Sequence, residues 1–171
     1  MCGIFLLCSK PAWIEAEYLG RKLYVGFKGK TNLSGRLVQA ISGERCLLTN
    51  SFGGMNREIQ ALDASYEGVI LLGMDTRLKN LVKIERIAEK ETAELSKLDL
   101  EDIAEGFRSN EIAAVISDEP THYLCNEAYW AALRKFQGRA VLLHVPSLKN
   151  AEGDFIPKMV AALDGLRLEF R

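Results

Sequence analysis

A short run of apolar residues constrains the fold of this chain more than any other feature. Between Gly68 and Gly73 the sequence reads Val-Ile-Leu-Leu without a polar residue, and a run this short predicts a strand buried on both faces, as in a parallel sheet covered by helices. Further apolar runs predict strands at 23–27, 45–49, 112–116 and 140–145, and amphipathic segments between them predict helices at 33–41, 56–64, 100–108, 127–136 and 155–163. This alternation predicts an α/β domain with a mostly parallel sheet.

The remaining segments give weaker signals. Met1 to Cys8 predicts another buried strand, Met74 to Leu81 a loop, and Lys90 to Lys97 a charged connector exposed to solvent. Val82 to Ala88 alternates without a clean period and predicts no particular element. Because 171 residues without an internal repeat is the length of one domain, we expect a single domain over 1–171.

Charge and cysteine content narrow the classes of function. A formal net charge of −1 gives no electrostatic preference for nucleic acid or for an anionic membrane, so neither is expected as a partner. The four cysteines are irregularly spaced, and only two histidines are present to join them as ligands; we therefore expect no metal, no disulfide framework and no cofactor. The apolar run Ile4 to Leu7 has no positive segment before it and is too short to span a bilayer, so a reduced, cytoplasmic setting is expected.

A cysteine and a histidine lie at the ends of neighbouring elements. Cys125 stands where a helix is expected to begin, and His144 stands at the end of the strand that follows. The positive end of the helix dipole favours a thiolate, and a histidine beside it is able to transfer protons, which is nucleophile chemistry. Strand ends are also where α/β sheets place ligand sites. The alternative is core packing, because Cys125 shares one helical stripe with apolar residues at 128, 129, 132, 133 and 136.

Other stretches suggest chemistry on fewer residues. The opening Met-Cys-Gly-Ile-Phe resembles that of class II glutamine amidotransferases, in which an N-terminal cysteine, here Cys2, uses its own α-amino group as base. That family has antiparallel sheets, and a buried strand containing Cys2 is the alternative. Gly53-Gly54 lacks the other residues of a phosphate-binding loop and predicts a strand-to-helix turn. Four charged residues show no metal-ligand spacing and are predicted, on composition alone, to be surface charges: Asp75, Arg77, Glu85 and Glu89.

Several short segments resemble those of the pyroglutamyl peptidase I family of cysteine peptidases. Tyr123 to Asn126 reads Tyr-Leu-Cys-Asn, and Leu143 to Pro146 reads Leu-His-Val-Pro, similar to the family's nucleophile and histidine segments. Ile84 to Ala88 resembles the segment that carries its third catalytic residue. The tripeptides at 25–27 and 32–34 resemble its first strand and the loop that follows. These segments keep the family's order over most of the chain.

The resemblance implies a fold, a reaction and a set of site residues. The fold is three-layer α/β/α with a mostly parallel central sheet, of the phosphorylase/hydrolase-like type, preceded here by an extra segment at 1–21. Cys125 is then the nucleophile, His144 the general base and later the acid, and Glu85 the group that orients His144. The substrate is a small peptide or amide cleaved after an N-terminal pyroglutamyl or similar small acyl group, and the family suggests a homo-oligomer. The resemblance implies three substrate-binding residues: Phe27, Met74 and Leu124.

Departures from the family concern specificity more than catalysis. The family's glutamine that helps bind the pyroglutamyl lactam has no counterpart in Met74 to Arg77, and Lys28 to Thr31 replaces a second pocket aromatic. The long loop expected between Ala88 and Leu98 is largely missing, and His122 stands where the family has a small residue. Loss of a hydrogen bond to substrate weakens selectivity. A non-catalytic or re-specialised relative that acts as a binding or assembly subunit is therefore kept as an alternative.

Overall fold

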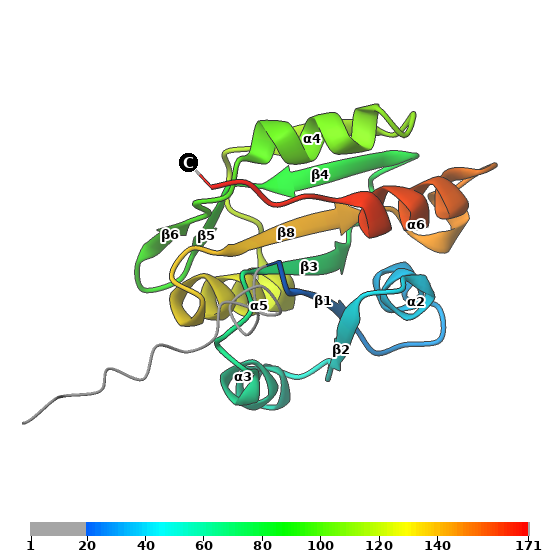
Figure 1. Cartoon of the computed structure of the whole chain (residues 1–171). Helices are drawn as coiled ribbons and strands as arrows, with labels where there is room; N and C mark the ends of the chain where they lie inside the picture. Colours follow the sequence, from blue (N-terminus) through cyan, green and yellow to red (C-terminus); the bar gives the residue numbers. More distant parts are fainter. Residues whose placement is uncertain (1–19, 171) are drawn as a thin grey trace, which may run out of the picture.

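A mostly parallel sheet forms the centre of the fold (Figure 1). The computed structural model describes residues 20–170, so the strand expected at Met1 to Cys8 lies outside the described residues, as does nearly all of the extra segment at 1–21. The strands of the sheet are β1 (Lys22–Phe27), β2 (Glu44–Leu48), β3 (Gly68–Met74), β4 (Leu81–Glu85), β7 (Ala113–Ser117) and β8 (Ala140–Val145). Their order is β2-β1-β3-β8-β4-β7. Neighbouring strands are parallel except β4 and β8, which run antiparallel.

Helices cover both faces of this sheet and give the three layers that were expected. They are α2 (Leu33–Ala40), α3 (Phe52–Ala61), α4 (Leu100–Arg108), α5 (Tyr123–Lys135) and α6 (Phe155–Gly165), with a short 3-10 helix η1 (Leu148–Asn150). The apolar side chains of α3 and α5 pack on one face, and those of α2, α4 and α6 pack on the other. Within residues 20–170, no helix has the length and apolar character that crossing a membrane requires.

The core lies in two layers because the strand side chains alternate between the faces. In β3, Val69 and Leu71 pack with α3 and α5, whereas Ile70 and Leu72 pack with α2, α4 and α6. All four side chains are fully buried. Burial of a side chain of this size contributes roughly 1.5–3 kcal/mol, so this strand is a major source of stability. The predicted burial of the Gly68 to Gly73 strand on both faces is confirmed.

A second, two-stranded sheet lies within 87–95, where the residue pattern predicts no clear strand. Its strands are β5 (Ile87–Glu89) and β6 (Ala93–Leu95), which pair antiparallel. The solvent exposure expected at Lys90 to Lys97 is confirmed, since most of these residues are exposed, but the segment is not only a connector, because Ala93–Leu95 forms a strand. The Asn126 amide of α5 donates to the Glu89 carbonyl at 2.6 Å and accepts from the Glu89 N–H at 3.1 Å. These hydrogen bonds attach the hairpin to α5. Because they are polar contacts, they produce no alternating apolar pattern from which the hairpin could have been predicted.

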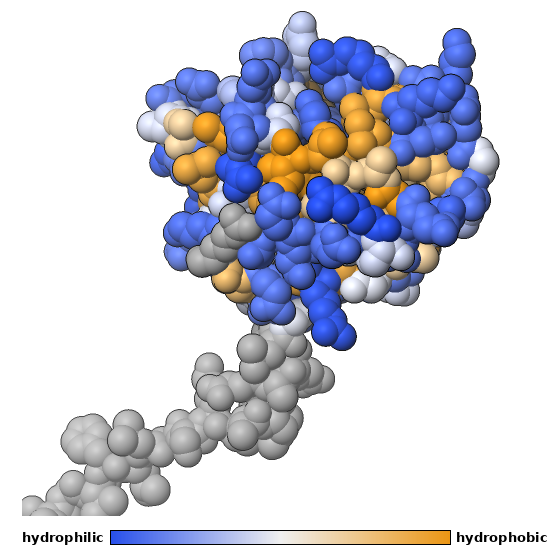
Figure 2. All heavy atoms as spheres, turned by 90° about the horizontal axis from the view of Figure 1, so that it is seen from above, coloured by the Kyte–Doolittle hydropathy of each residue, from blue (hydrophilic) through white to orange (hydrophobic). Residues whose placement is uncertain are grey.

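On the face seen in Figure 2, an apolar band crosses a mostly hydrophilic surface. Hydrophilic residues border this band. Large hydrophobic side chains that stay exposed in the described chain include Val115 on the edge strand β7 and Phe170 near the end. Single exposed apolar residues are normal, so neither residue alone indicates a function.

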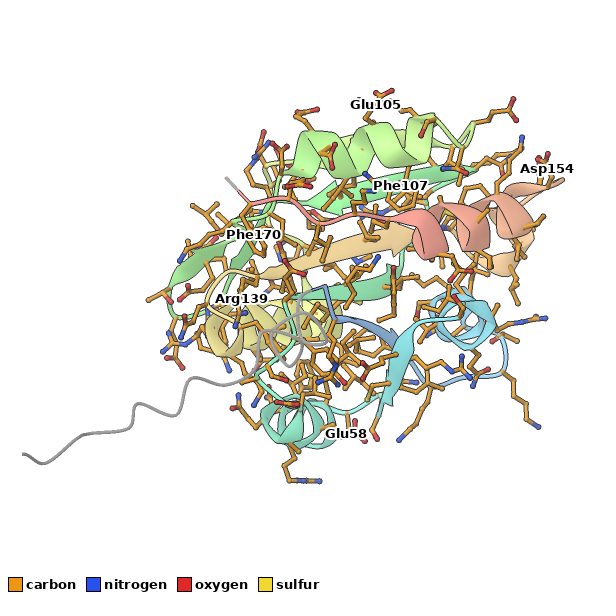
Figure 3. The ribbon with its side chains drawn as sticks, in the orientation of Figure 1. Glu58, Glu105, Phe107, Arg139, Asp154 and Phe170 are labelled. Carbon is orange, nitrogen blue, oxygen red and sulfur yellow. The ribbon has the colours of Figure 1, made fainter. Side chains whose placement is uncertain are left out.

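The helix α4 shows how local sequence sets one element. The Asp99 carboxylate caps its first turn by accepting hydrogen bonds from the backbone N–H groups of Glu101 and Asp102, at 3.1 and 3.2 Å. Phe107 points toward the sheet and is fully buried, whereas Glu105 points away from it (Figure 3). The helix therefore presents one apolar face, as its sequence period predicts.

We expect Asp99→Ala to lower the free energy of unfolding by about 1 kcal/mol, because two backbone N–H groups lose their side-chain acceptor. Urea denaturation followed by circular dichroism measures the change. Glu105→Ala on the outer face of the same helix is the matched control, and it should change stability by less than about 0.5 kcal/mol. Equal effects of the two substitutions would contradict the capping role.

Candidate active site

The register of three strands brings the central residues into one row. Gly73 of β3 lies directly beside His144 of β8, and Lys83 of β4 lies opposite His144 on its other side. Glu85 is two residues beyond Lys83, so it projects from the same face of the sheet. This is the face that α5 covers, since Leu142 of β8 also points there. Gly73 and His144 in this row lie next to Cys125, which belongs to the first turn of α5.

A buried carboxylate and an imidazole form the inner part of the site. Glu85 Oε1 lies 2.7 Å from His144 Nδ1, and the two side chains are 0 % and 4 % exposed. Glu85 is therefore not a surface charge, and that prediction is wrong, because its position on β4 directs it under α5. Of its two oxygens, Oε2 is buried and has no hydrogen-bond partner among the described residues.

Lys83 supplies a second positive partner to the same carboxylate. Its Nζ lies 2.9 Å from Glu85 Oε1 and 3.9 Å from Asp75 Oδ2. Burial on its own raises the pKa of Glu85, but the hydrogen bonds from His144 and Lys83 outweigh it and hold that pKa below its ordinary value. These contacts favour the ionised form of Glu85 although its side chain is fully buried.

Cys125 reaches this pair from the first turn of α5. A side chain at Gly73 would place its Cβ 2.9 Å from Cys125 Sγ and 3.0 Å from His144 Nε2, so sulfur and nitrogen lie within about 6 Å of each other. No hydrogen bond joins them in the part of the chain that the structure describes. Catalytic hydrogen bonds are often long without substrate, so this geometry is compatible with proton transfer. The structure brings together Cys125, His144 and Glu85.

The thiol of Cys125 is less acidic than the helix dipole suggests. The pKa of Cys125 is raised to about 11, mainly by burial; a backbone hydrogen bond from Met74 lowers it, and the nearby charges of Glu85 and Asp75 add smaller increases. The thiolate expected at the helix start is therefore wrong for the resting site, since desolvation dominates. Cys125 also packs against the same core cluster as Tyr129, so it is both a packed residue and a neighbour of His144.

An open cavity of about 580 Å³ lies above these groups. Its walls come from the segment after β3, the start of α5 with the segment before it, and the strands β4, β7 and β8. It is lined by Met74, Asp75, Thr76, Arg77, Lys83, Ser117, Glu119, Pro120, Thr121, His122, Tyr123, Cys125 and His144. A cavity of this size holds a small ligand rather than a folded partner.

The residues expected to bind substrate divide between the cavity and the core. Met74 lines the cavity. Phe27 is buried in the core with the side chains of α3 and α5, and Leu124 packs against the same cluster; neither lines this cavity, and their role in binding stays a prediction. His122 is the N-cap residue of α5 and lines the cavity without making a side-chain capping bond. Cys2 lies outside the described residues.

Two charged groups beside the cavity were not expected from the sequence. The Asp75 carboxylate accepts two hydrogen bonds from the Arg77 guanidinium, at 3.0 and 2.8 Å, and this contact lowers the pKa of Asp75 to about 2. Lys83 was missed as well, although its spacing of two residues from Glu85 is the signal that places both on one face. Within residues 20–170, no three His, Cys, Asp or Glu side chains are grouped to hold a metal ion.

Comparison with known proteins identifies relatives by structure alone. No protein-family model matches the sequence, and no curated protein matches it. Three similar solved structures are those of pyrrolidone carboxyl peptidase from Thermococcus litoralis, pyroglutamyl peptidase I from Bacillus amyloliquefaciens and pyrrolidone carboxyl peptidase from Thermus thermophilus. Their sequence identities are 20%, 15% and 17%, with TM-scores of 0.72, 0.71 and 0.70. Each alignment covers 85% of this chain and 90%, 93% and 100% of the other. At this identity the match establishes the fold, and the resemblance seen in the sequence is confirmed at that level.

Gly73→Ala should lower the free energy of unfolding by about 1–3 kcal/mol, because the added methyl group meets both the sulfur and the imidazole ring at the distances given above. Chemical denaturation measures the loss. Gly165→Ala is the matched control, since a Cβ there meets nothing within 4 Å and alanine favours the helix. If the two variants were equally stable, a Cβ at Gly73 would not be in close contact with Cys125 and His144, and the prediction would be refuted.

Alkylation of Cys125 by iodoacetamide should accelerate about tenfold for each pH unit between about pH 7 and pH 10, because the raised pKa leaves the thiol protonated over that range. Mass spectrometry of the Cys125 peptide gives the rate separately from the other cysteines. A rate that levels off below about pH 8 would show that the thiolate forms at neutral pH and would contradict the effect of burial.

Proposed function

We propose that the chain is a cysteine hydrolase that cleaves the amide bond after an N-terminal pyroglutamyl or similar small acyl group. The observation that carries the proposal is the buried Glu85–His144 pair, 2.7 Å between Oε1 and Nδ1, whose free ring nitrogen faces Cys125 across Gly73. The fold shared with solved pyroglutamyl peptidases supports it. The cavity beside Cys125 has room for a small acyl group.

The proposed reaction begins with proton transfer during attack. Because the pKa of Cys125 is high, the thiol loses its proton to His144 Nε2 as Sγ attacks the amide carbonyl carbon. The Glu85 carboxylate, hydrogen-bonded at Nδ1, stabilises the imidazolium that forms. His144 then donates this proton to the leaving amine, the carbon–nitrogen bond breaks, and a thioester remains. Water, deprotonated by His144, hydrolyses the thioester and restores the thiol.

The start of α5 is the proposed site for the carbonyl oxygen. The first N–H groups of a helix have no intrahelical acceptor, and His122 makes no side-chain capping bond here. The N–H groups of Tyr123, Leu124 and Cys125 are therefore available for a developing negative charge, which the helix dipole also favours. Tyr123 has a φ of +66°, a conformation rare for a bulky residue and common at functional sites.

A second candidate function is a non-catalytic subunit that keeps this fold. It is favoured by the high pKa of Cys125, which keeps the thiol protonated at neutral pH. In that case the cavity binds a ligand without cleaving it, and Cys125 serves mainly in packing. Catalysis is preferred because packing alone gives no reason to bury the ionised Glu85 beside His144.

Hydrolysis of pyroglutamyl-aminomethylcoumarin tests the proposal. We expect turnover by the wild type and a fall in kcat/KM of about 10³-fold or more in Cys125→Ser, because a serine hydroxyl is a far weaker nucleophile in this setting. Cys46→Ser is the matched control, since Cys46 is a free cysteine on β2 that does not line the cavity, and it should keep its activity within about twofold.

Two outcomes would count against hydrolysis. Equal rates in the wild type and Cys125→Ser would remove Cys125 from the reaction. Absence of turnover in both, together with no alkylation of Cys125 by iodoacetamide at high pH, would favour the binding subunit instead.

A further inference from the structure

Lys83 contacts the same carboxylate oxygen that holds His144. Lys83 Nζ lies 2.9 Å and His144 Nδ1 lies 2.7 Å from Glu85 Oε1. The Lys83 side chain is 21 % exposed and lines the cavity, so it reaches the buried pair from the solvent side. The antiparallel pairing of β4 with β8 sets Lys83 opposite His144 and fixes this three-way contact.

The charge on Glu85 needs a positive partner because the carboxylate is fully buried. Without Lys83, a proton bound by the Glu85–His144 pair would have to balance the charge of the carboxylate. The pair would then hold that proton to higher pH, since removing a cation from the neighbourhood of two coupled groups increases their affinity for protons. An imidazole that already carries the proton cannot accept another from Cys125.

The other charged and titratable groups facing the pair do not replace Lys83. They are Tyr123, Cys125 and Tyr129 from α5, Glu119 and His122 from the segment before it, and Asp75 and Arg77 from the segment after β3. In the described chain none of these forms a hydrogen bond or an ion pair with the Glu85 carboxylate oxygens, as Lys83 and His144 do. Asp75 and Arg77 are paired with each other, so their charges largely cancel. Tyr129 donates its hydroxyl hydrogen to the Glu85 backbone carbonyl at 2.8 Å and adds no charge. From the edge strand β7, Ser117 stands opposite Glu85 and is uncharged.

We propose that Lys83 is a positioning residue that keeps the Glu85–His144 pair free of an extra proton near neutral pH, so that His144 Nε2 is open to accept the proton of Cys125. Lys83 does this by neutralising the carboxylate in place of a proton. The link to catalysis rests on the proposed function, whereas the effect on the pair does not require the chain to be an enzyme.

The ring resonances of His144 report the proton directly. The chain has two histidines, so His122→Gln assigns the signals in NMR spectra recorded against pH. In Lys83→Met we expect the titration midpoint of the His144 ring to rise by about one pH unit or more, as expected for loss of a charge at this range. Lys83→Arg keeps the cation and should return the midpoint to within a few tenths of a unit of the wild type. Lys83→Gln gives a second neutral variant should Lys83→Met not fold.

Lys158→Met is the matched control. Lys158 also lies between two carboxylates, 2.6 Å from Glu111 and 2.9 Å from Asp154, but it belongs to α6 and does not line the cavity. It should leave the His144 titration unchanged. The proposal is overturned if the neutral Lys83 variants titrate like the wild type, or if Lys158→Met produces the same shift.

Activity gives a second readout that separates this inference from the proposed function. For pyroglutamyl-aminomethylcoumarin, the acidic limb of the kcat/KM profile of Lys83→Met should move up by the same amount as the midpoint, with the rate recovering at high pH. An acidic limb that stays in place would overturn the catalytic link. If the wild type shows no Cys125-dependent turnover, the proposed function fails, and the NMR titration still decides whether Lys83 controls the pair.

Discussion

A single buried carboxylate, that of Glu85, sets the requirements that the rest of the site meets. Moving an ionised carboxylate out of water costs several kcal/mol unless it is paired and hydrogen-bonded. His144 and Lys83 meet this cost at one oxygen. Lys83 reaches it from the same face of β4, two residues before Glu85, whereas His144 reaches it because β4 runs against β8. The antiparallel pairing of β4 with β8 is therefore the feature that brings His144 to the charged centre.

Cys125 lies beside this centre, and Gly73 and burial set its surroundings. Gly73 leaves the volume that the sulfur of Cys125 and the ring of His144 share. Burial raises the pKa of the Cys125 thiol to about 11, which favours the thiol over the thiolate near neutral pH. A protonated thiol is a poor nucleophile until a neighbouring base takes its proton.

The sequence predicts the strands of the central sheet and the helices that cover it, because apolar runs indicate the strands and helical periods indicate the helices. The buried strand at Gly68 to Gly73 follows from composition alone, and the motifs around Cys125 and His144 indicate the fold that the solved structures confirm. The burial of Glu85 is not predictable from its neighbours, since only the pairing of β4 with β8 places it under α5. The placement of the β5–β6 hairpin depends on contacts with Asn126, far along the chain. The contact of Lys83 with Glu85 is local, and their spacing of two residues on one strand is a signal that the sequence does carry.

Asp75 links the buried Glu85–His144 pair to the protein surface through a series of ion pairs. From Arg77, which is 81 % exposed, charges alternate inward through Asp75 and Lys83 to Glu85. Dissolved salt screens the outer members of this series and hardly reaches the inner ones. The buried pair is thus insulated from the ionic strength of the medium, while a charged group on a molecule seated in the cavity acts on it at short range.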